Sequence, residues 1–233
     1  MRGRLGLSAQ ALKWIAMVSM LMDHVGIYLG RCNVDWEIWK WFRIIGRIAF
    51  PLYCFLLVEG FFHTGDIKKY LIRIGAFALI SEIPFDLFLC GTWFYPGYQN
   101  VGVTLFIGLL LLYLYNRFVG NVQPIYAIMA LISMMCLGYL TGCDYGAEGV
   151  LLIFLFYFFR FRPVPMLLST GIVMVLMGGL EPFGVLAFLL ILFYNGNKGW
   201  TPEGKTAGLV WKYSFYVFYP LHLLVLAVLS FLR

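Results

Sequence analysis

The sequence predicts an all-α protein, a polytopic membrane bundle of about nine transmembrane helices whose amino terminus is cytoplasmic. Its 233 residues are 62% hydrophobic and only 12% charged, and the mean hydropathy is +0.87. Both values lie outside the range of water-soluble domains. Apolar runs near the roughly 20 residues that cross a bilayer recur along the whole chain. We therefore expect one integral-membrane domain, residues 1–233, in a bacterial cytoplasmic membrane in contact with lipid.

Nine apolar segments are expected to form the helices. They lie at about 9–30, 41–62, 67–90, 101–118, 121–140, 146–160, 163–180, 182–195 and 209–231. Short connections rich in Pro, Gly and Asn separate them. The first segment has a basic front end, but it is long, contains Asp23 and His24, and has no small-residue cleavage signature behind it. A retained helix is therefore favoured over a signal peptide.

The distribution of basic residues predicts the orientation, because Lys and Arg near a membrane stay on the cytoplasmic side. With the amino terminus inside, twelve of the seventeen basic residues fall on the inner side: Arg2, Arg4, Lys13, Lys68, Lys69, Arg73, Arg117, Arg160, Arg162, Lys198, Lys205 and Lys212. The outer side holds Arg31, Lys40, Arg43, Arg47 and Arg233. The net charge of +6 is then a topogenic signal, and it gives no argument for a nucleic-acid partner.

The five cysteines predict neither a zinc site nor a complete disulfide framework. Their number is odd and none has CxxC spacing, so no metal cofactor is expected. A Cys32–Cys90 or a Cys90–Cys143 bridge on the outer side stays open.

Ionisable side chains inside the apolar segments are the strongest functional signal. Each costs roughly 2.5–3.5 kcal/mol on insertion scales, so it normally faces a polar interior. Asp23 and His24 in the first segment are the first candidates, since histidine exchanges protons near neutral pH. Neighbouring residues on a helix point about 100° apart. We therefore expect the orienting partner of His24 to come from another helix.

Further polar residues extend the candidate site. They are Arg47 and Glu59 in the second segment, Lys69, Arg73, Glu82 and Asp86 in the third, Asn100 and Thr104 at the start of the fourth, and Tyr219 and His222 in the ninth. Spacing of four residues places Lys69 with Arg73, and Glu82 with Asp86, on shared helix faces. The structural alternative is that Asp23 pairs with Arg47, and Glu59 with Lys69 or Arg73, to hold helices in register.

A family resemblance rests on four stretches: Leu12-Lys13-Trp14 to Asp23-His24, Gly46-Arg47 to Glu59-Gly60, Ser81-Glu82-Ile83-Pro84-Phe85, and Tyr219-Pro220 with His222. They resemble the TraX family, from about residue 10 to the carboxyl terminus. The family's namesake is a conjugation protein that acetylates the amino terminus of pilin subunits. The wider pattern is also similar to integral-membrane acyltransferases that modify cell-surface sugars.

The resemblance implies an acyl-CoA-dependent N- or O-acyltransferase, most simply one that uses acetyl-CoA. It implies His24 as catalytic base, Lys69 and Arg73 as acyl-CoA contacts, and Arg47 and Glu59 as site-lining residues. The chemistry of these side chains is consistent with the implied roles, because a positioned histidine can deprotonate an acceptor and cationic side chains pair with phosphates.

The remaining candidates complete this hypothesis. Asp23 would tune or position the base, and Glu82 and His222 would line the site. Donors for the developing oxyanion would come from Arg47, Asn100, Thr104 or Tyr219. The acceptor, an amine or hydroxyl of a pilin-like peptide or an envelope glycan, would approach from the outer side.

Two other functions stay open. A proton-coupled transporter or flippase would use Asp23, His24 and Glu82 as proton carriers, although the sequence has no clear internal repeat. A structural subunit of a conjugation or secretion complex would neither bind CoA nor move a substrate.

Overall fold

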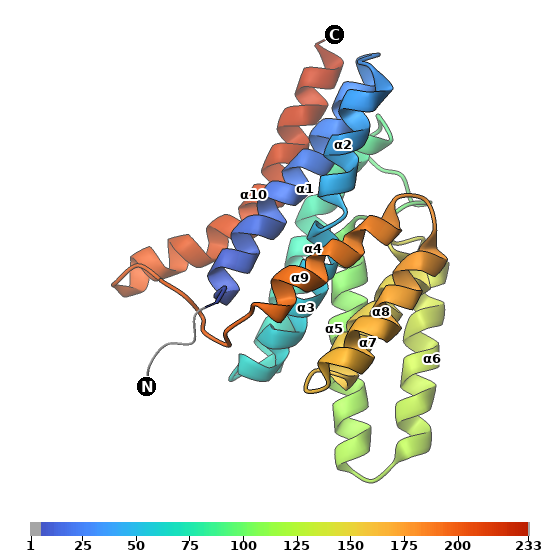
Figure 1. Ribbon diagram of the computed structural model, residues 1–233, viewed down its shortest axis with the longest axis vertical. Coiled ribbons are helices and arrows are strands. Elements are labelled where there is room, and N and C mark those ends of the chain that lie inside the picture. The colour runs from blue at the N-terminus through green and yellow to red at the C-terminus, as the bar shows by residue number, and fades with distance from the viewer. Residues whose placement is uncertain (1–5, 233) are drawn as a thin grey trace. The chain divides into compact units, whose positions relative to one another are not determined.

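The computed structural model describes residues 6–232 as helices joined by turns and loops (Figure 1). Residues 1–5 and 233, with Arg2, Arg4 and Arg233, lie outside the described residues, as does the side chain of Lys205. No β-strand forms within residues 6–232, so the all-α prediction is confirmed. Contacts divide the chain into two compact units, residues 1–56 with 174–233, and residues 57–173.

The first unit joins the two ends of the sequence. Its helices are α1 (Ala9–Arg31), α2 (Trp36–Gly46), η1 (Glu181–Leu186), α9 (Ala187–Leu192) and α10 (Lys205–Phe231). The chain enters the second unit within α3 (Ala49–His63) and returns within α8 (Pro163–Met177). Helix α1 packs along α2 and also contacts α10, while η1 contacts α2 and α9.

Side-chain caps and glycines explain the α1–α2 hairpin. Ser8 Oγ accepts from the Ala11 N–H at the start of α1, and Asp35 accepts from the Glu37 N–H at the start of α2, which satisfies otherwise unpaired helix donors. The two helices approach closely at Gly46, where a Cβ atom would lie 2.7 Å from Asp23 Cα. The hairpin therefore requires a residue without a side chain at position 46.

Helix α5 is the centre of the second unit. Its residues Val101–Gly120 contact α4 (Ile67–Leu89), α6 (Pro124–Leu140) and α7 (Gly146–Phe158). The Asn100 side chain accepts from the Gly102 N–H at 2.8 Å and begins α5. Asp66 similarly accepts from the Lys69 N–H at 3.0 Å and begins α4.

All nine expected segments contain helix, but two differ from their predicted form. The segment 41–62 is interrupted at Arg47 and Ile48, between α2 and α3. Pro51 explains the break, because it has no N–H to donate to the Arg47 carbonyl four residues earlier. The segment 182–195 is a 3-10 turn followed by the six-residue α9.

The helices are those of a multi-pass membrane protein. Within the described chain, four stretches are long and apolar enough to span a bilayer: Ala9–Arg31, Trp36–His63, Val101–Gly120 and Thr206–Phe231. Shorter apolar helices cover Pro124–Leu140, Gly146–Phe158, Pro163–Met177 and Glu181–Leu192. Large apolar side chains such as Ile125 and Ile132 on α6, and Leu221 and Val228 on α10, are exposed, as lipid contact requires. The direction of insertion stays a prediction.

Neither of the two disulfides considered from the sequence forms. Cys32, Cys54, Cys90, Cys136 and Cys143 are all present as thiols. Cys143 is buried, and its Sγ lies 3.3 Å from the Gly138 carbonyl oxygen. Its place is therefore explained by local packing and a weak hydrogen bond.

Gly46→Ala should destabilise the first unit. The added methyl group would press on the Asp23 backbone, and overpacking of this kind typically costs about 1–3 kcal/mol. Thermal unfolding in detergent should show a lower midpoint. Gly30→Ala is the matched control, because its Cβ would sit 3.5 Å from the Trp39 ring, an ordinary contact. Equal midpoints for the two variants would contradict the close approach.

Candidate functional site

Four charged side chains of the first unit form a compact network around Asp23. Arg43 Nη1 donates to Asp23 Oδ2 at 2.6 Å. Arg47 donates to Asp23 Oδ1 through Nη2 and to Glu181 Oε1 through Nη1. The predicted Asp23–Arg47 ion pair is therefore confirmed. Two guanidinium groups and two carboxylates leave the network without net charge.

Three helical segments position the four members of this network. Arg43 lies in the last turn of α2, and Arg47 caps the carboxyl-terminal end of that helix. The two residues are four positions apart, so they share a helix face. Glu181 is the first residue of η1, which contacts α2. Asp23 and Arg47 are 9% and 7% exposed, and buried charges require partners because burial removes their hydration. The network therefore joins α1, α2 and η1.

A pair of buried histidines lies on α1 and α10. His24 Nδ1 is 2.7 Å from His222 Nε2, and the ring centroids are 4.9 Å apart. His222 is thus the partner from another helix that the sequence predicts for His24. Tyr219, one turn before His222, places its ring 5.9 Å from the His24 ring and is 2% exposed.

The Phe218 carbonyl sets the hydrogen positions in this pair. His222 Nδ1 lies 2.8 Å from the Phe218 oxygen, which can only accept, so Nδ1 of His222 carries a hydrogen. In the neutral ring its Nε2 is then an acceptor, and it takes the Nδ1 hydrogen of His24. With both rings neutral, these hydrogen bonds leave the basic lone pair on Nε2 of His24.

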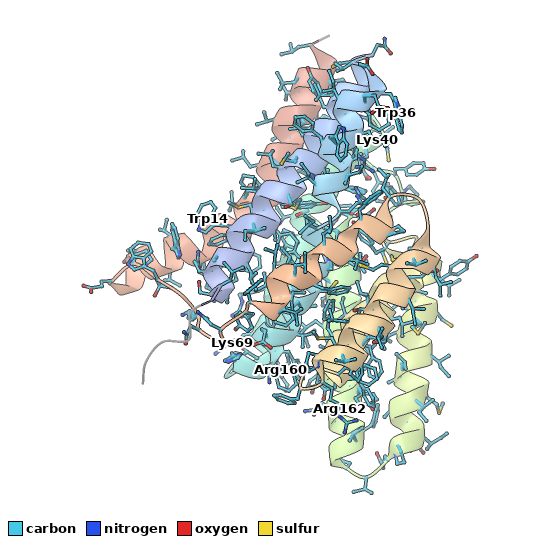
Figure 2. All side chains as sticks on the ribbon, in the orientation of Figure 1. Trp14, Trp36, Lys40, Lys69, Arg160 and Arg162 are labelled. Atoms are coloured by element: carbon cyan, nitrogen blue, oxygen red, sulfur yellow. The ribbon has the colours of Figure 1, made fainter. Side chains whose placement is uncertain are left out.

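The second unit pairs Glu59 with an unexpected residue. Arg160 donates to Glu59 from Nε at 2.6 Å and from Nη2 at 3.1 Å, and its guanidinium lies 4.2 Å from the Phe62 ring centroid. Arg160 is labelled in Figure 2. The alternative pairing of Glu59 with Lys69 or Arg73 is wrong, because a bidentate arginine from the turn after α7 satisfies the buried carboxylate.

Lys69 and Arg73 lie on α4 of the second unit. The Lys69 side chain is 77% exposed and its Nζ is 3.3 Å from Asp66 (Lys69 is labelled in Figure 2). The Lys69 backbone N–H also donates to Asp66 and holds the pKa of that carboxyl below its ordinary value. Arg73 lies over the Tyr70 ring at 5.3 Å. Their role as acyl-CoA contacts stays a prediction.

Glu82, Asn100 and Thr104 also belong to the second unit. Asn100 donates to Glu82 and, at 2.8 Å, to the Ala78 carbonyl. Thr104 Oγ1 accepts from the Tyr145 N–H at 3.4 Å. Asn100 and Thr104 are both fully buried. These contacts hold α4, α5 and the start of α7 together.

An open hollow of about 600 Å³ lies at one end of the second unit. Its lining residues are Phe61, Phe62, Thr64, Gly65, Ile67, Tyr113, Asn116 and Arg117. Among these described residues Arg117 supplies the positive charge, while Lys69 and Arg73 do not take part in the lining.

Three residues of these networks are absent from the predicted site. Arg43 shares the helix face of Arg47, and that spacing is the signal that could have found it. Glu181 lies in a Glu-Pro-Phe-Gly stretch that looks like a connection. Arg160 looks like an inner-side topogenic charge. The two latter residues are separated from their partners by 134 and 101 positions, which no local pattern reports.

Comparison with known proteins identifies the family. The family model described as TraX protein matches residues 8–230. The chain belongs to the TraX family. A relative named probable fimbrial assembly protein FimC, serogroup H1, from Dichelobacter nodosus is 30% identical over 243 residues, covering 94% of this chain and 94% of the relative. No solved structure matches the chain.

Arg47→Met should strongly destabilise this TraX-family protein. The substitution removes the cation that both Asp23 and Glu181 contact, and stranding buried charges typically costs about 3–5 kcal/mol. Thermal unfolding in detergent should report the loss. Lys40→Met is the control, since the Lys40 ammonium lies 4.3 Å from the Trp36 ring centroid and forms no ion pair with the described carboxylates. An Arg47→Met midpoint equal to that of the control would show that the network is not a stabilising element.

Proposed function

We propose that this TraX-family protein is an integral-membrane acyltransferase. It moves an acyl group, in the simplest case acetyl, from cytoplasmic acyl-CoA to an amine or hydroxyl acceptor at the outer side of the membrane. The observation that carries the proposal is the buried His24–His222 pair, in which hydrogen bonding directs the basic lone pair to one nitrogen, Nε2 of His24.

In the proposed reaction this nitrogen is the general base. His24 Nε2 takes the proton of the acceptor N–H or O–H as the acceptor atom bonds to the thioester carbonyl carbon. The tetrahedral intermediate then collapses, the carbon–sulfur bond breaks, and the CoA sulfur receives the proton from His24. An acylated acceptor and CoA are formed, and the histidine returns to its starting state.

His222 acts as a positioning residue in this scheme. When His24 gains a proton at Nε2, its Nδ1–H still points at His222 Nε2, 2.7 Å away, so the imidazolium charge is stabilised by a fixed acceptor. The Phe218 carbonyl in turn fixes the orientation of the His222 ring. Tyr219, buried beside His24, is the first-unit candidate for a donor to the developing oxyanion.

Asp23 is also a positioning residue, since its carboxylate contacts Arg43 and Arg47. These ion pairs fix α1 against α2 and so fix the next residue, His24. Asp23 would therefore act on the base indirectly, through the placement of α1 against α2.

The donor and acceptor follow from the family resemblance and from the name of the relative. The TraX namesake acetylates pilin, and the D. nodosus relative carries the name of a fimbrial assembly protein. A pilin-like peptide amine is therefore the favoured acceptor, with an envelope glycan hydroxyl as the second. Acetyl-CoA is the favoured donor.

His24→Gln should abolish acetyl transfer. Loss of a positioned base typically lowers the rate 10²–10⁴-fold. We would measure thiol release from acetyl-CoA by purified protein in detergent, with and without a peptide that has a free amino terminus, and follow peptide acetylation by mass spectrometry. His63→Gln is the matched control, because the third histidine is exposed at the end of α3. Full activity of a folded His24→Gln variant would refute the assignment, and proton-linked substrate movement without acetylation would favour a transporter.

Two substitutions of His222 should separate positioning from packing. The glutamine of His222→Gln would keep an oxygen that can accept the His24 Nδ1 hydrogen, whereas the leucine of His222→Leu would not. His222→Leu should therefore lower kcat at least tenfold more than His222→Gln, with little change in the KM for acetyl-CoA. Equal kcat losses in two folded variants would contradict a hydrogen-bonding role for His222.

A further inference from the structure

Three segments of the first unit meet at the amino-terminal ends of α1 and α10. The loop before α10 is hydrogen-bonded to the start of α1, where the Ala9 N–H donates to Asn197 at 2.8 Å and the Gln10 N–H donates to Lys198 at 3.1 Å. A second pair of bonds joins Leu7 to Phe193 and Asn195. Lys198 is therefore fixed beside the first turn of α1.

Aromatic rings connect the same place to α10. The Trp14 ring lies 5.8 Å from Trp211 and 5.4 Å from Phe215, and Trp200 from the loop lies 5.5 Å from Trp211. Figure 2 labels Trp14 on α1, beside the amino-terminal half of α10. These contacts, typical of side chains at a membrane interface, hold the three segments together.

The cationic groups at this junction lie close to one another. Lys13 is within electrostatic reach of both Lys198 and Lys212, and its Nζ lies 5.9 Å from the Phe215 ring centroid. Within the described residues, neither Lys13 nor Lys198 has a carboxylate within ion-pair distance. Like charges held together are unfavourable unless an anion joins them.

Two buried donors point to the same kind of ligand. The side-chain nitrogens Gln10 Nε2 and Trp211 Nε1 are buried, and neither has a hydrogen-bond partner among the described residues. A buried donor without an acceptor is destabilising, because it loses its hydrogen bonds to water. Gln10 is one turn from Lys13, and Trp211 is adjacent to Lys212, so cations and unsatisfied donors gather where the three segments meet.

We propose that Gln10, Lys13, Lys198, Trp211 and Lys212, here called the lysine site, bind the phosphate groups of acyl-CoA. The proposal rests on the proposed acyltransferase function, because it assigns the ligand class from the donor substrate. Phosphate esters suit the site, since they accept several hydrogen bonds and carry negative charge. The lysine residues also lie on the side that their distribution predicts to be cytoplasmic, where acyl-CoA is available.

The distance from the lysine site to the histidine pair fits this donor. Lys13 and His24 are eleven residues apart on α1, which places them about 16 Å apart along the axis and nearly on the same face. Trp211 and His222 are also eleven residues apart on α10. The pantetheine arm of CoA has about thirteen bonds between its phosphate and its sulfur. Fully extended, the arm is roughly 15 Å long. Phosphates at the lysine site would let the thioester reach His24.

The test is acetyl-CoA binding to the purified full-length protein, measured calorimetrically in detergent. Lys13→Met combined with Lys198→Ala should weaken acetyl-CoA and adenosine 3′,5′-bisphosphate at least tenfold, a loss of about 1.4 kcal/mol or more. Lys13→Arg keeps the charge and should retain binding, and Lys40→Met, on α2 away from this site, should match wild type. Unchanged affinities in the folded double variant would overturn the assignment of acyl-CoA.

A second arm separates the two natural sources of phosphate esters. Binding of the same variants to phosphatidylglycerol vesicles is compared with binding to phosphatidylcholine vesicles. If the double variant loses its preference for phosphatidylglycerol and keeps acetyl-CoA affinity, the site holds lipid headgroups and the acyl-CoA assignment is overturned. If neither ligand is affected, the phosphate site itself is refuted.

The outcomes also distinguish this site from the proposed enzyme activity. Acetyl transfer that depends on His24, with unchanged KM for acetyl-CoA in the double variant, would leave the acyltransferase standing and refute the lysine site. Lysine-dependent CoA binding without any acetyl transfer by wild type would support the site as a CoA site and refute the acyltransferase.

Discussion

The first unit depends on one guanidinium group, that of Arg47, shared by two carboxylates from different parts of the chain. Arg47 contacts Asp23 on α1 and Glu181 on η1, and Arg43 adds a second cation to Asp23. Each charge would be costly alone in an apolar interior, but together they neutralise one another. The cost of separating them is what makes this arrangement specific: helices that slide past one another would expose an unpaired charge to the bilayer interior.

The histidine pair is a consequence of that arrangement. His24 follows Asp23 directly, so the anchored carboxylate leaves the imidazole pointing about 100° away, toward α10. There Pro220 lies inside the helix, and Figure 1 shows that α10 bends. Tyr219 and His222 on either side of that proline face His24. The ion-pair network and the proposed base are thus next to each other in sequence but have separate partners, so Asp23 holds the helix while His24 is left for proton transfer.

The parts of this arrangement that depend on local geometry can be predicted from the sequence. The adjacency of Asp23 and His24 correctly implies that His24 needs a partner from another helix, and charge complementarity identifies Arg47 as the partner of Asp23. Charge complementarity alone cannot assign Arg160 to Glu59, because several arginines and lysines are equally suitable partners. Only the tertiary fold brings one of them to the carboxylate. Glu181 falls between the expected segments 163–180 and 182–195, where it looks like part of a connection. Pro51 indicates the break between α2 and α3. The apolar segment 41–62 is continuous, however, and this favours a single helix.

Phe218, His222 and His24 form a directed hydrogen-bond relay that ends at Nε2 of His24. Nitrogen-15 NMR of histidine-labelled protein in lipid bilayers can test this relay, with His63→Gln removing the third histidine signal. At neutral pH we expect a hydrogen on Nδ1 of both rings and an unprotonated Nε2 on both, with a hydrogen-bond coupling between His24 Nδ1 and His222 Nε2. A hydrogen on Nε2 of His24 in the resting protein would refute the relay, because the nitrogen proposed as base would then have no lone pair to offer.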